Sequence, residues 1–152
     1  MKESFSMTDR FSLTAPYILG LTRFLAGVMF ACHGAQKMLG AFGGLPPGAM
    51  NWMTWTAGII ELVGGTLVAI GLFARISAFI SSGLMAFAYF IGHGLNSFWP
   101  KANGGELAVL YCWLFLYLAA AGPGAYALDN LWRRRRIGGG PETDALAASP
   151  PA

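Results

Sequence analysis

The sequence has few charged residues for its length. Only 11% of its 152 residues are Asp, Glu, Lys or Arg, whereas soluble domains contain about 25%. The hydrophobic fraction is 55% and the mean hydropathy is +0.53, so the chain has too little charge to cover a surface in water. This composition argues against a soluble helical bundle and favours an integral membrane protein.

Cysteine and short metal-binding motifs are also scarce. Cys32 and Cys112 lie in apolar runs and form neither a CxxC pair nor a disulfide framework. We expect both to pack as small apolar side chains. The sequence has no short-spacing motif such as HExxH, so we assign no residue as a metal ligand.

Four apolar runs are long enough to cross a membrane. Breaks rich in Gly, Pro or Asn follow the first and third runs, and a tight turn at Arg75 separates the second from the third. The predicted spans are residues 16–39, 52–73, 76–95 and 106–121. The first is too long for a cleaved signal peptide, and Pro16 suits the first turn of its helix. The predicted fold is all-α, an integral membrane four-helix bundle at 16–132, with a polar lead at 1–15 and a basic block and disordered tail at 133–152.

Basic residues are concentrated on the side of the two termini, where we place Lys2, Arg10, Arg75 and the arginines at 133–136. Only Lys37 and Lys101 fall on the opposite side. By the positive-inside rule, the sequence predicts a multi-pass protein of the cytoplasmic membrane with both termini in the cytoplasm. The arginine block suits anionic lipid, and nucleic acid is not expected as a partner because no second basic patch accompanies it.

The first run carries ionisable side chains inside a span, where they need partners. One helical face of this run combines small residues with charge: Arg23, Ala26, Gly27, Phe30, Gly34 and Lys37. Such a face suits close packing against another helix. His33 lies at its edge.

Glu61 in the second run is a candidate partner for these charges. At 1.5 Å per residue, Glu61 lies roughly 13 Å into its span, while His33 and Arg23 lie roughly 9 and 24 Å from the end of theirs. Glu61 can therefore reach either one. One interpretation is a structural ion pair. The other is a polar chamber that binds a small ligand or relays protons, lined by Arg23, His33, Glu61, His93 and Glu106.

A weak internal repeat supports two helical hairpins. His33-Gly34 and His93-Gly94 end the first and third spans, and Glu61-Leu62 and Glu106-Leu107 follow in the next spans. Three ligands suit such residues: a haem held by the two histidines, a metal held by the His and Glu side chains, and a quinone or quinol. The quinone is preferred, because its head group needs a few donors and a proton acceptor in an apolar cavity.

As a set, these motifs resemble the DoxX family of small bacterial four-span membrane proteins. The resemblance rests on Arg23-x-x-x-Gly27, HGAQK at 33–37, GIIELVGGTLVAIGLFAR at 58–75, His93-Gly94, NGGELAVLY at 103–111 and GPGAYALD at 122–129. It implies a cytoplasmic-membrane bundle with a role as an oxidoreductase or as the membrane subunit of one. Members are similar to the membrane subunit of a thiosulfate:quinone oxidoreductase or are linked to thiol and quinone stress.

Our leading hypothesis is a membrane subunit that handles a quinone-like or sulfur-linked electron carrier, together with a redox partner subunit. We expect His33 and Glu61 to act as the catalytic pair that binds the ligand and exchanges protons. The expected ligand-binding residues are Arg23, Lys37, Tyr89, His93 and Glu106. The alternative is a non-enzymatic membrane interaction or small-molecule permeation protein whose buried charges are structural.

Overall fold

The computed structural model describes residues 7–95 and 97–132, and all regular structure in these ranges is helical. The elements are α1 (Met7–Leu39), η1 (Ala41–Gly43), α2 (Trp52–Ile59), η2 (Ile60–Gly64), α3 (Gly65–Ile70), α4 (Ala74–Ala88), η3 (Tyr89–His93), α5 (Pro100–Asn103) and α6 (Glu106–Ala121). η1 is a 3-10 helix, whereas η2 and η3 are π-helical turns. The predicted tail at 133–152 lies outside the described residues.

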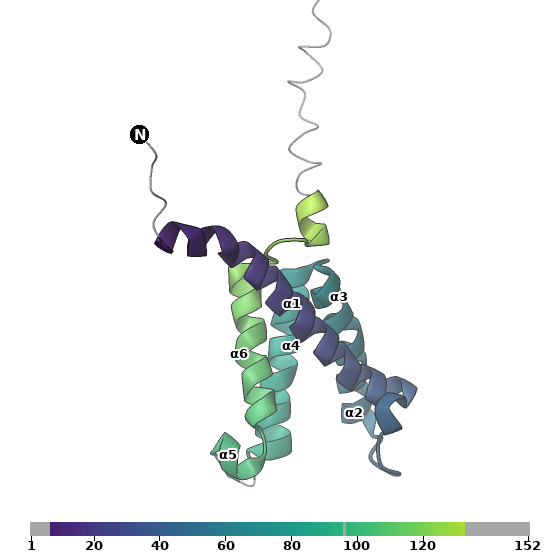
Figure 1. Ribbon diagram of the computed structural model, residues 1–152. Helices are drawn as coiled ribbons and strands as arrows, with labels where there is room; N and C mark the ends of the chain where they lie inside the picture. The colour runs from purple at the N-terminus through teal and green to yellow at the C-terminus, as the bar shows by residue number, and fades with distance from the viewer. Residues whose placement is uncertain (1–6, 96, 133–152) are drawn as a thin grey trace, which may run out of the picture.

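Four long helices form the bundle, which confirms the predicted all-α fold (Figure 1). The second helix is continuous through α2, η2 and α3, and the third through α4 and η3. α1 packs along the second helix, and α4 packs along α6, so the chain forms two helical hairpins. Phe30 of α1 closes the bundle against Phe115 of α6, with ring centroids 4.7 Å apart.

Among the residues that the structure describes, three helices are long and apolar enough to span a membrane: Phe11–Leu39, Trp52–Ile70 and Ala74–His93. The shorter Glu106–Ala121 helix is also apolar. These bounds agree with the predicted spans to within a few residues, except at the first. α1 begins at Met7, inside the predicted lead, so Pro16 lies within the helix instead of in its first turn.

Pro16 explains the shape of α1. A proline inside a helix removes one backbone hydrogen bond and bends the helix. The N-terminal part of α1, dark purple in Figure 1, runs across one end of the bundle before the helix turns along it. The Pro16 carbonyl accepts a hydrogen bond from Ala125 N at 2.8 Å, which ties α1 to the segment after α6.

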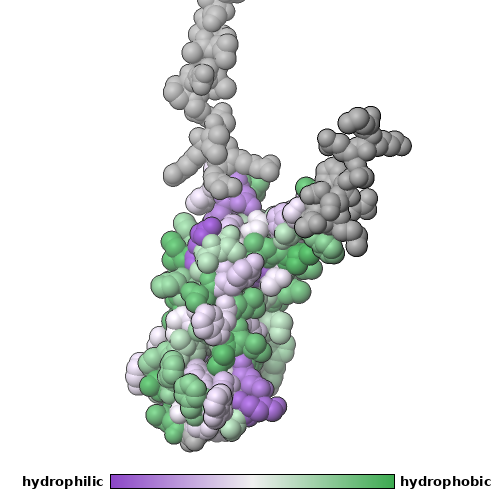
Figure 2. Space-filling model, turned by 90° about the vertical axis from the view of Figure 1, so that its left-hand side faces the viewer, coloured by the Kyte–Doolittle hydropathy of each residue, from purple (hydrophilic) through white to green (hydrophobic). Residues whose placement is uncertain are grey.

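The sides of the bundle are apolar. Figure 2 shows one face on which hydrophobic residues predominate along the length of the bundle and the most hydrophilic residues lie toward its two ends. Large hydrophobic side chains are exposed on all four long helices, among them Leu21, Val63, Phe79 and Leu110. Exposed apolar surface of this extent is typical of contact with lipid. The protein is therefore a membrane protein with several spans.

We name the two ends of the bundle by what they contain. The terminal end (upper in Figure 1) holds the start of α1, the α3–α4 turn and residues 122–132. The loop end (lower in Figure 1) holds η1 and α5. Exposed aromatic side chains lie at both ends, including Tyr17 and Trp132 at the former and Trp52 and Trp99 at the latter. Such aromatics favour the membrane–water interface.

The predicted stripe of small residues packs against the second helix. A Cβ atom on Gly27 would overlap the backbone of Ala69, and one on Gly34 would overlap the backbone of Leu62. From the other side, a Cβ on Gly65 would lie 2.6 Å from Ala31 N. Glycine is therefore required where the two backbones touch, as in other close-packed membrane helices.

We expect Gly34→Ala to lower the free energy of unfolding by about 1–3 kcal/mol, because the new methyl group overlaps the Leu62 backbone. Gly83→Ala is the matched control, since a Cβ at that exposed site on α4 meets nothing within 4 Å. It should stabilise the helix by about 0.5–1 kcal/mol. Unfolding in mixed detergent micelles measures both, and an equal effect of the two changes would contradict the backbone contact.

Candidate functional site

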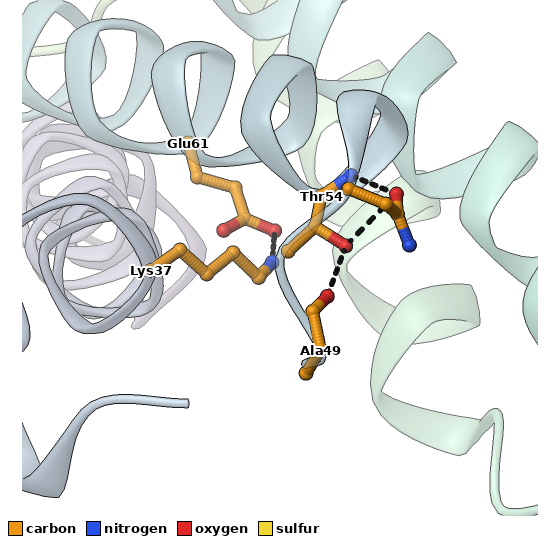
Figure 3. Close-up of polar contacts among 5 residues, drawn as sticks. Lys37, Ala49, Thr54 and Glu61 are labelled. Atoms are coloured by element: carbon orange, nitrogen blue, oxygen red, sulfur yellow. Dashed lines mark hydrogen bonds and ion pairs between the residues drawn. The ribbon is translucent and has the colours of Figure 1, made fainter. Parts of the chain in front are cut away.

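Glu61 and Lys37 form an ion pair between the first two helices, with Lys37 Nζ against Glu61 Oε1 (Figure 3). Glu61 is only 3% exposed. Gly34 lets the two backbones touch at Leu62, so Lys37, one turn further along α1, comes level with Glu61. The sequence had predicted His33 or Arg23 as the partner of Glu61. The structure corrects this, because neither has a hydrogen bond or ion pair to Glu61 within the described residues.

The backbone around Glu61 is a π-helical turn. η2 spans Ile60–Gly64, and Glu61 is its second residue. π turns insert an extra residue into a helix and often occur at functional sites. Glu61 also has an unusual second oxygen: Oε2 is buried and has no hydrogen-bond partner among residues 7–95 and 97–132. The ion pair therefore uses only half of this buried carboxylate.

A groove of about 570 Å³ lies beside the ion pair at the loop end, between α2, α4 and η3. Its walls are mostly apolar and include Trp52, Met53, Leu84, Phe87 and Ile91. Lys37 and His93 supply its charged and titratable side chains. The structure thus brings two of the predicted ligand-binding residues, Lys37 and His93, to one groove, with Glu61 directly behind Lys37.

His93 is oriented by the loop before α6. Its Nδ1 lies 3.0 Å from the carbonyl oxygen of Asn103. A carbonyl only accepts, so Nδ1 carries the proton, and in the neutral ring Nε2 is then the acceptor. His93 is half-buried and lines the groove. It can therefore accept a proton or a hydrogen bond from a bound molecule.

Tyr89 holds the same loop and does not line the groove. Its hydroxyl donates to the carbonyl of Phe98, and Asn103 Nδ2 donates to the carbonyl of Ser97 at 2.7 Å. Asn103 Oδ1 also accepts from Gly105 N at 2.8 Å, just before α6 begins. Tyr89 and Asn103 thus fix the segment that orients His93, so the tyrosine acts in positioning.

Glu106 lies outside the predicted chamber, which corrects its assignment. It is the first residue of α6, where acidic side chains are favourable, and its side chain is 57% exposed. It faces Lys101 at 3.9 Å. The equivalent residue in the predicted repeat, Glu61, is buried. The two copies of the sequence motif therefore occupy different environments, although two helical hairpins are present.

Arg23 also lies away from the Lys37–Glu61 pair, at the terminal end. It is 3% exposed, and each of its five N–H groups has a backbone carbonyl as acceptor. The acceptors are Val68, Ala69, Pro123, Ala125 and Tyr126. With all its donors used by the backbone, Arg23 joins α1, α3 and the segment after α6. This corrects its assignment to a ligand-binding chamber.

Two further residues at the terminal end were not predicted to act in this way. The Asp129 carboxylate accepts hydrogen bonds from Phe73 N and Ala74 N at 2.8 and 2.9 Å, and so caps the start of α4. Arg75 Nη1 donates to the carbonyls of Ala119 and Ala120, both at 2.8 Å, at the end of α6. The GPGAYALD motif is thus a structural element that ties three helix ends together.

His33 faces α6, and its ring stands perpendicular to that of Tyr111 with centroids 6.1 Å apart. Tyr111 is buried, and its ring also contacts those of Phe30 and Phe115. Its hydroxyl has no hydrogen-bond partner in the described part of the chain, and neither has the hydroxyl of Ser81 on α4. Sequence reasoning missed both residues, although each is a polar group in an apolar run.

Neither cysteine is paired with the other. Cys32 and Cys112 are free and half-buried, and Cys112 Sγ lies 3.6 Å from Ser82 Oγ. Within the residues that the structure describes, no three His, Cys, Asp or Glu side chains are placed to hold a metal ion. The chemistry available at the loop end is therefore that of an amine, a carboxylate and an imidazole.

Comparison with known proteins links this chain to one family. The DoxX family model matches residues 18–94, about half of the chain. An uncharacterized protein of Haemophilus influenzae is 48% identical over 128 residues, which cover 76% of this chain and 90% of that protein. An uncharacterized membrane protein of Mycobacterium tuberculosis is 26% identical over 130 residues, or 74% and 80% of the two chains. No solved structure matches.

We call the five carbonyls that accept hydrogen bonds from Arg23 the Arg23 cage. Because of this cage, replacing Arg23 by Lys should destabilise the protein more than the same change at Arg75. Arg23→Lys keeps the charge but replaces five planar donors by three, so we expect a loss of roughly 2–4 kcal/mol in the free energy of unfolding. Arg75→Lys is the control, because Arg75 is exposed and bonds two carbonyls. Its cost should stay below about 1 kcal/mol. Unfolding in detergent measures both variants. Equal losses of unfolding free energy in Arg23→Lys and Arg75→Lys would contradict a special role for the Arg23 cage.

Proposed function

Because this chain belongs to the DoxX family of membrane proteins, we propose that it is a membrane component of redox metabolism that binds a quinone-like electron carrier. One observation carries the proposal. The groove at the loop end has apolar walls and is lined by Lys37 and His93, and Lys37 is paired with the buried Glu61. Ligand sites are typically apolar pockets with a few convergent polar groups.

The groups in the groove suit the two redox states of a quinone. A quinone oxygen accepts a hydrogen bond, which the Lys37 ammonium can donate. A quinol hydroxyl donates one, which Nε2 of neutral His93 can accept. Reduction of the quinone takes up two electrons and two protons. Lys37, Glu61 and His93 supply and recover the protons, and the electrons come from a redox partner subunit or a sulfur-linked carrier.

The groove also offers a route for an apolar tail. Phe87 and Ile91 line it and are 51% and 45% exposed on the side of the bundle. An isoprenoid chain attached to the head group can therefore run over them into the surrounding lipid. In this arrangement the polar head lies near Lys37, and the tail leaves the protein without crossing its core.

The alternative is a non-enzymatic membrane interaction or permeation protein whose buried charges only hold helices together. Arg23 supports this alternative, because a buried charge there is used entirely by backbone carbonyls. The Lys37–Glu61 pair differs from Arg23 in two respects. It borders an apolar groove, and one carboxylate oxygen has no partner among the described residues.

Quinone binding can be tested directly by quenching of tryptophan fluorescence in detergent, since Trp52 lines the groove. We expect a short-tailed benzoquinone to bind the wild type, and the double change Lys37→Met/Glu61→Gln to weaken binding at least about tenfold. Changing both partners avoids leaving one buried charge unpaired. Lys101→Met, on a side chain that is 88% exposed, should bind as the wild type does. Absent binding, or equal affinity in all three proteins, would support the structural alternative.

We also propose that the protein lies in the cytoplasmic membrane with its terminal end toward the cytoplasm. Arg75 is exposed at that end, and the sequence adds Lys2, Arg10 and four arginines at 133–136. Lys37 and Lys101 lie toward the other end. Basic residues favour the cytoplasmic side of a membrane. The groove then opens on the outer half of the bilayer.

Reporter fusions check this orientation. We expect green fluorescent protein fused after residue 152 to fluoresce and alkaline phosphatase at the same place to be inactive, because each folds on one side of the membrane only. Fusion of the phosphatase within the 40–51 segment should give the opposite result. Active phosphatase at the C-terminus would reverse the orientation and move the groove to the cytoplasmic half.

A further inference from the structure

A pocket of about 730 Å³ lies at the terminal end, opposite the groove, and we call it the terminal pocket. It is formed by α1 near its proline, by the start of α4 and by the segment after α6. Its apolar lining includes Leu19, Phe73 and Ile76. Arg75 and Asp129 also line it and bring one positive and one negative charge. None of these residues takes part in the proposed quinone site.

Arg75 is held in place by the end of α6. Its Nη1 donates to the carbonyls of Ala119 and Ala120, both at 2.8 Å, and its guanidinium packs against Gly122, where a Cβ would lie 2.8 Å from Nη2. Nε and Nη2 have no hydrogen bond to the part of the chain that the structure describes. These two nitrogens form an edge of the guanidinium that can bind a phosphate with two parallel hydrogen bonds.

Asp129 is fixed beside Arg75 by the backbone of α4. Its two oxygens accept from Phe73 N and Ala74 N, the residues directly before Arg75. A carboxylate has about four acceptor positions, and these two bonds use one on each oxygen. Asp129 is half-buried and lines the terminal pocket. It can therefore accept further hydrogen bonds from a cation in the pocket.

The two charges define the class of ligand that fits. A ligand that is only anionic would bind Arg75 but be repelled by the Asp129 carboxylate, and a ligand that is only cationic would meet the reverse problem. A group that carries a phosphate and an ammonium satisfies both residues. The pocket also lies at the level where such groups are found in a membrane, because Tyr17 and Trp132 are exposed at the same end and such aromatics favour the headgroup region.

We propose that the terminal pocket binds one phospholipid with a zwitterionic phosphoethanolamine headgroup, with its phosphate on Nε and Nη2 of Arg75 and its ammonium on Asp129. Two carbon atoms join the phosphate to the ammonium, so one headgroup can reach two neighbouring side chains. The acyl chains run over Phe73 and Ile76, which are 52% and 63% exposed, into the surrounding lipid. This site does not depend on a quinone in the groove.

The headgroup can be tested on the wild type alone. Native mass spectrometry of the delipidated full chain in detergent measures the Kd of phosphatidylethanolamine, phosphatidylglycerol and phosphatidylcholine with identical acyl chains. We expect the first to bind at least about fivefold more tightly than the others. Phosphatidylglycerol has no ammonium, and the choline ammonium has no N–H to donate. Equal affinities, or tighter binding of phosphatidylglycerol, would overturn the proposal. Displacement of the lipid by soluble O-phosphoethanolamine at the same concentration would overturn a lipid as the occupant.

Two variants test the assigned residues. Arg75→Lys keeps the charge but lacks the Nε–Nη2 edge, so the Kd for phosphatidylethanolamine should rise about three- to tenfold. Asp129→Asn should remove the preference for phosphatidylethanolamine over phosphatidylglycerol. Lys101→Met, at the loop end, should bind each lipid as the wild type does. An unchanged Kd in Arg75→Lys, or a preserved preference in Asp129→Asn, would overturn the site. Should Asp129→Asn fail to fold without its bond to Ala74 N, Arg75→Lys and the wild-type lipid series decide.

Discussion

The fold depends on satisfying backbone carbonyls at the terminal end of the bundle. The last carbonyls of a helix have no partner within that helix, and in a membrane this is costly. Arg23 resolves the problem for α3 and the segment after α6, because a planar guanidinium can serve five acceptors at once. Arg75 does the same for the last carbonyls of α6, and the Asp129 carboxylate accepts hydrogen bonds from the first N–H groups of α4. These contacts set the relative positions of all four helices, and hence the groove at the other end.

The buried Arg23 and the half-buried Lys37 of α1 therefore have different roles. Arg23 is saturated by the backbone and has no donor left for a ligand. Lys37 is bound to one oxygen of Glu61 and still lines an apolar groove. Burial alone does not separate a structural charge from a candidate functional one. What separates them is whether every donor and acceptor is already used.

Much of the architecture follows from the sequence, but the pairing of charges does not. Apolar runs gave the helices, and the small residues around Gly27 and Gly34 gave the face of α1 that packs. Depth along each span was not enough to predict Lys37 as the partner of Glu61. Which side chains meet also depends on the rotation of each helix about its axis and on the extra residue of η2. Glu106 looked equivalent to Glu61, yet its place at the start of α6 exposes it. Unpartnered atoms such as Tyr111 Oη become visible only in three dimensions.

The glycine contacts of α1 have a mechanical consequence. Where Gly27, Gly34 and Gly65 bring two backbones together, neither helix can slide without a clash, so the first hairpin moves as one rigid body. The second hairpin meets it partly through small residues as well, because Ser81 of α4 lies against Gly64 of η2. The groove lies along the seam between these two bodies, with α2 on one side and α4 on the other. The width of the groove is therefore set by how closely α4 lies against α2.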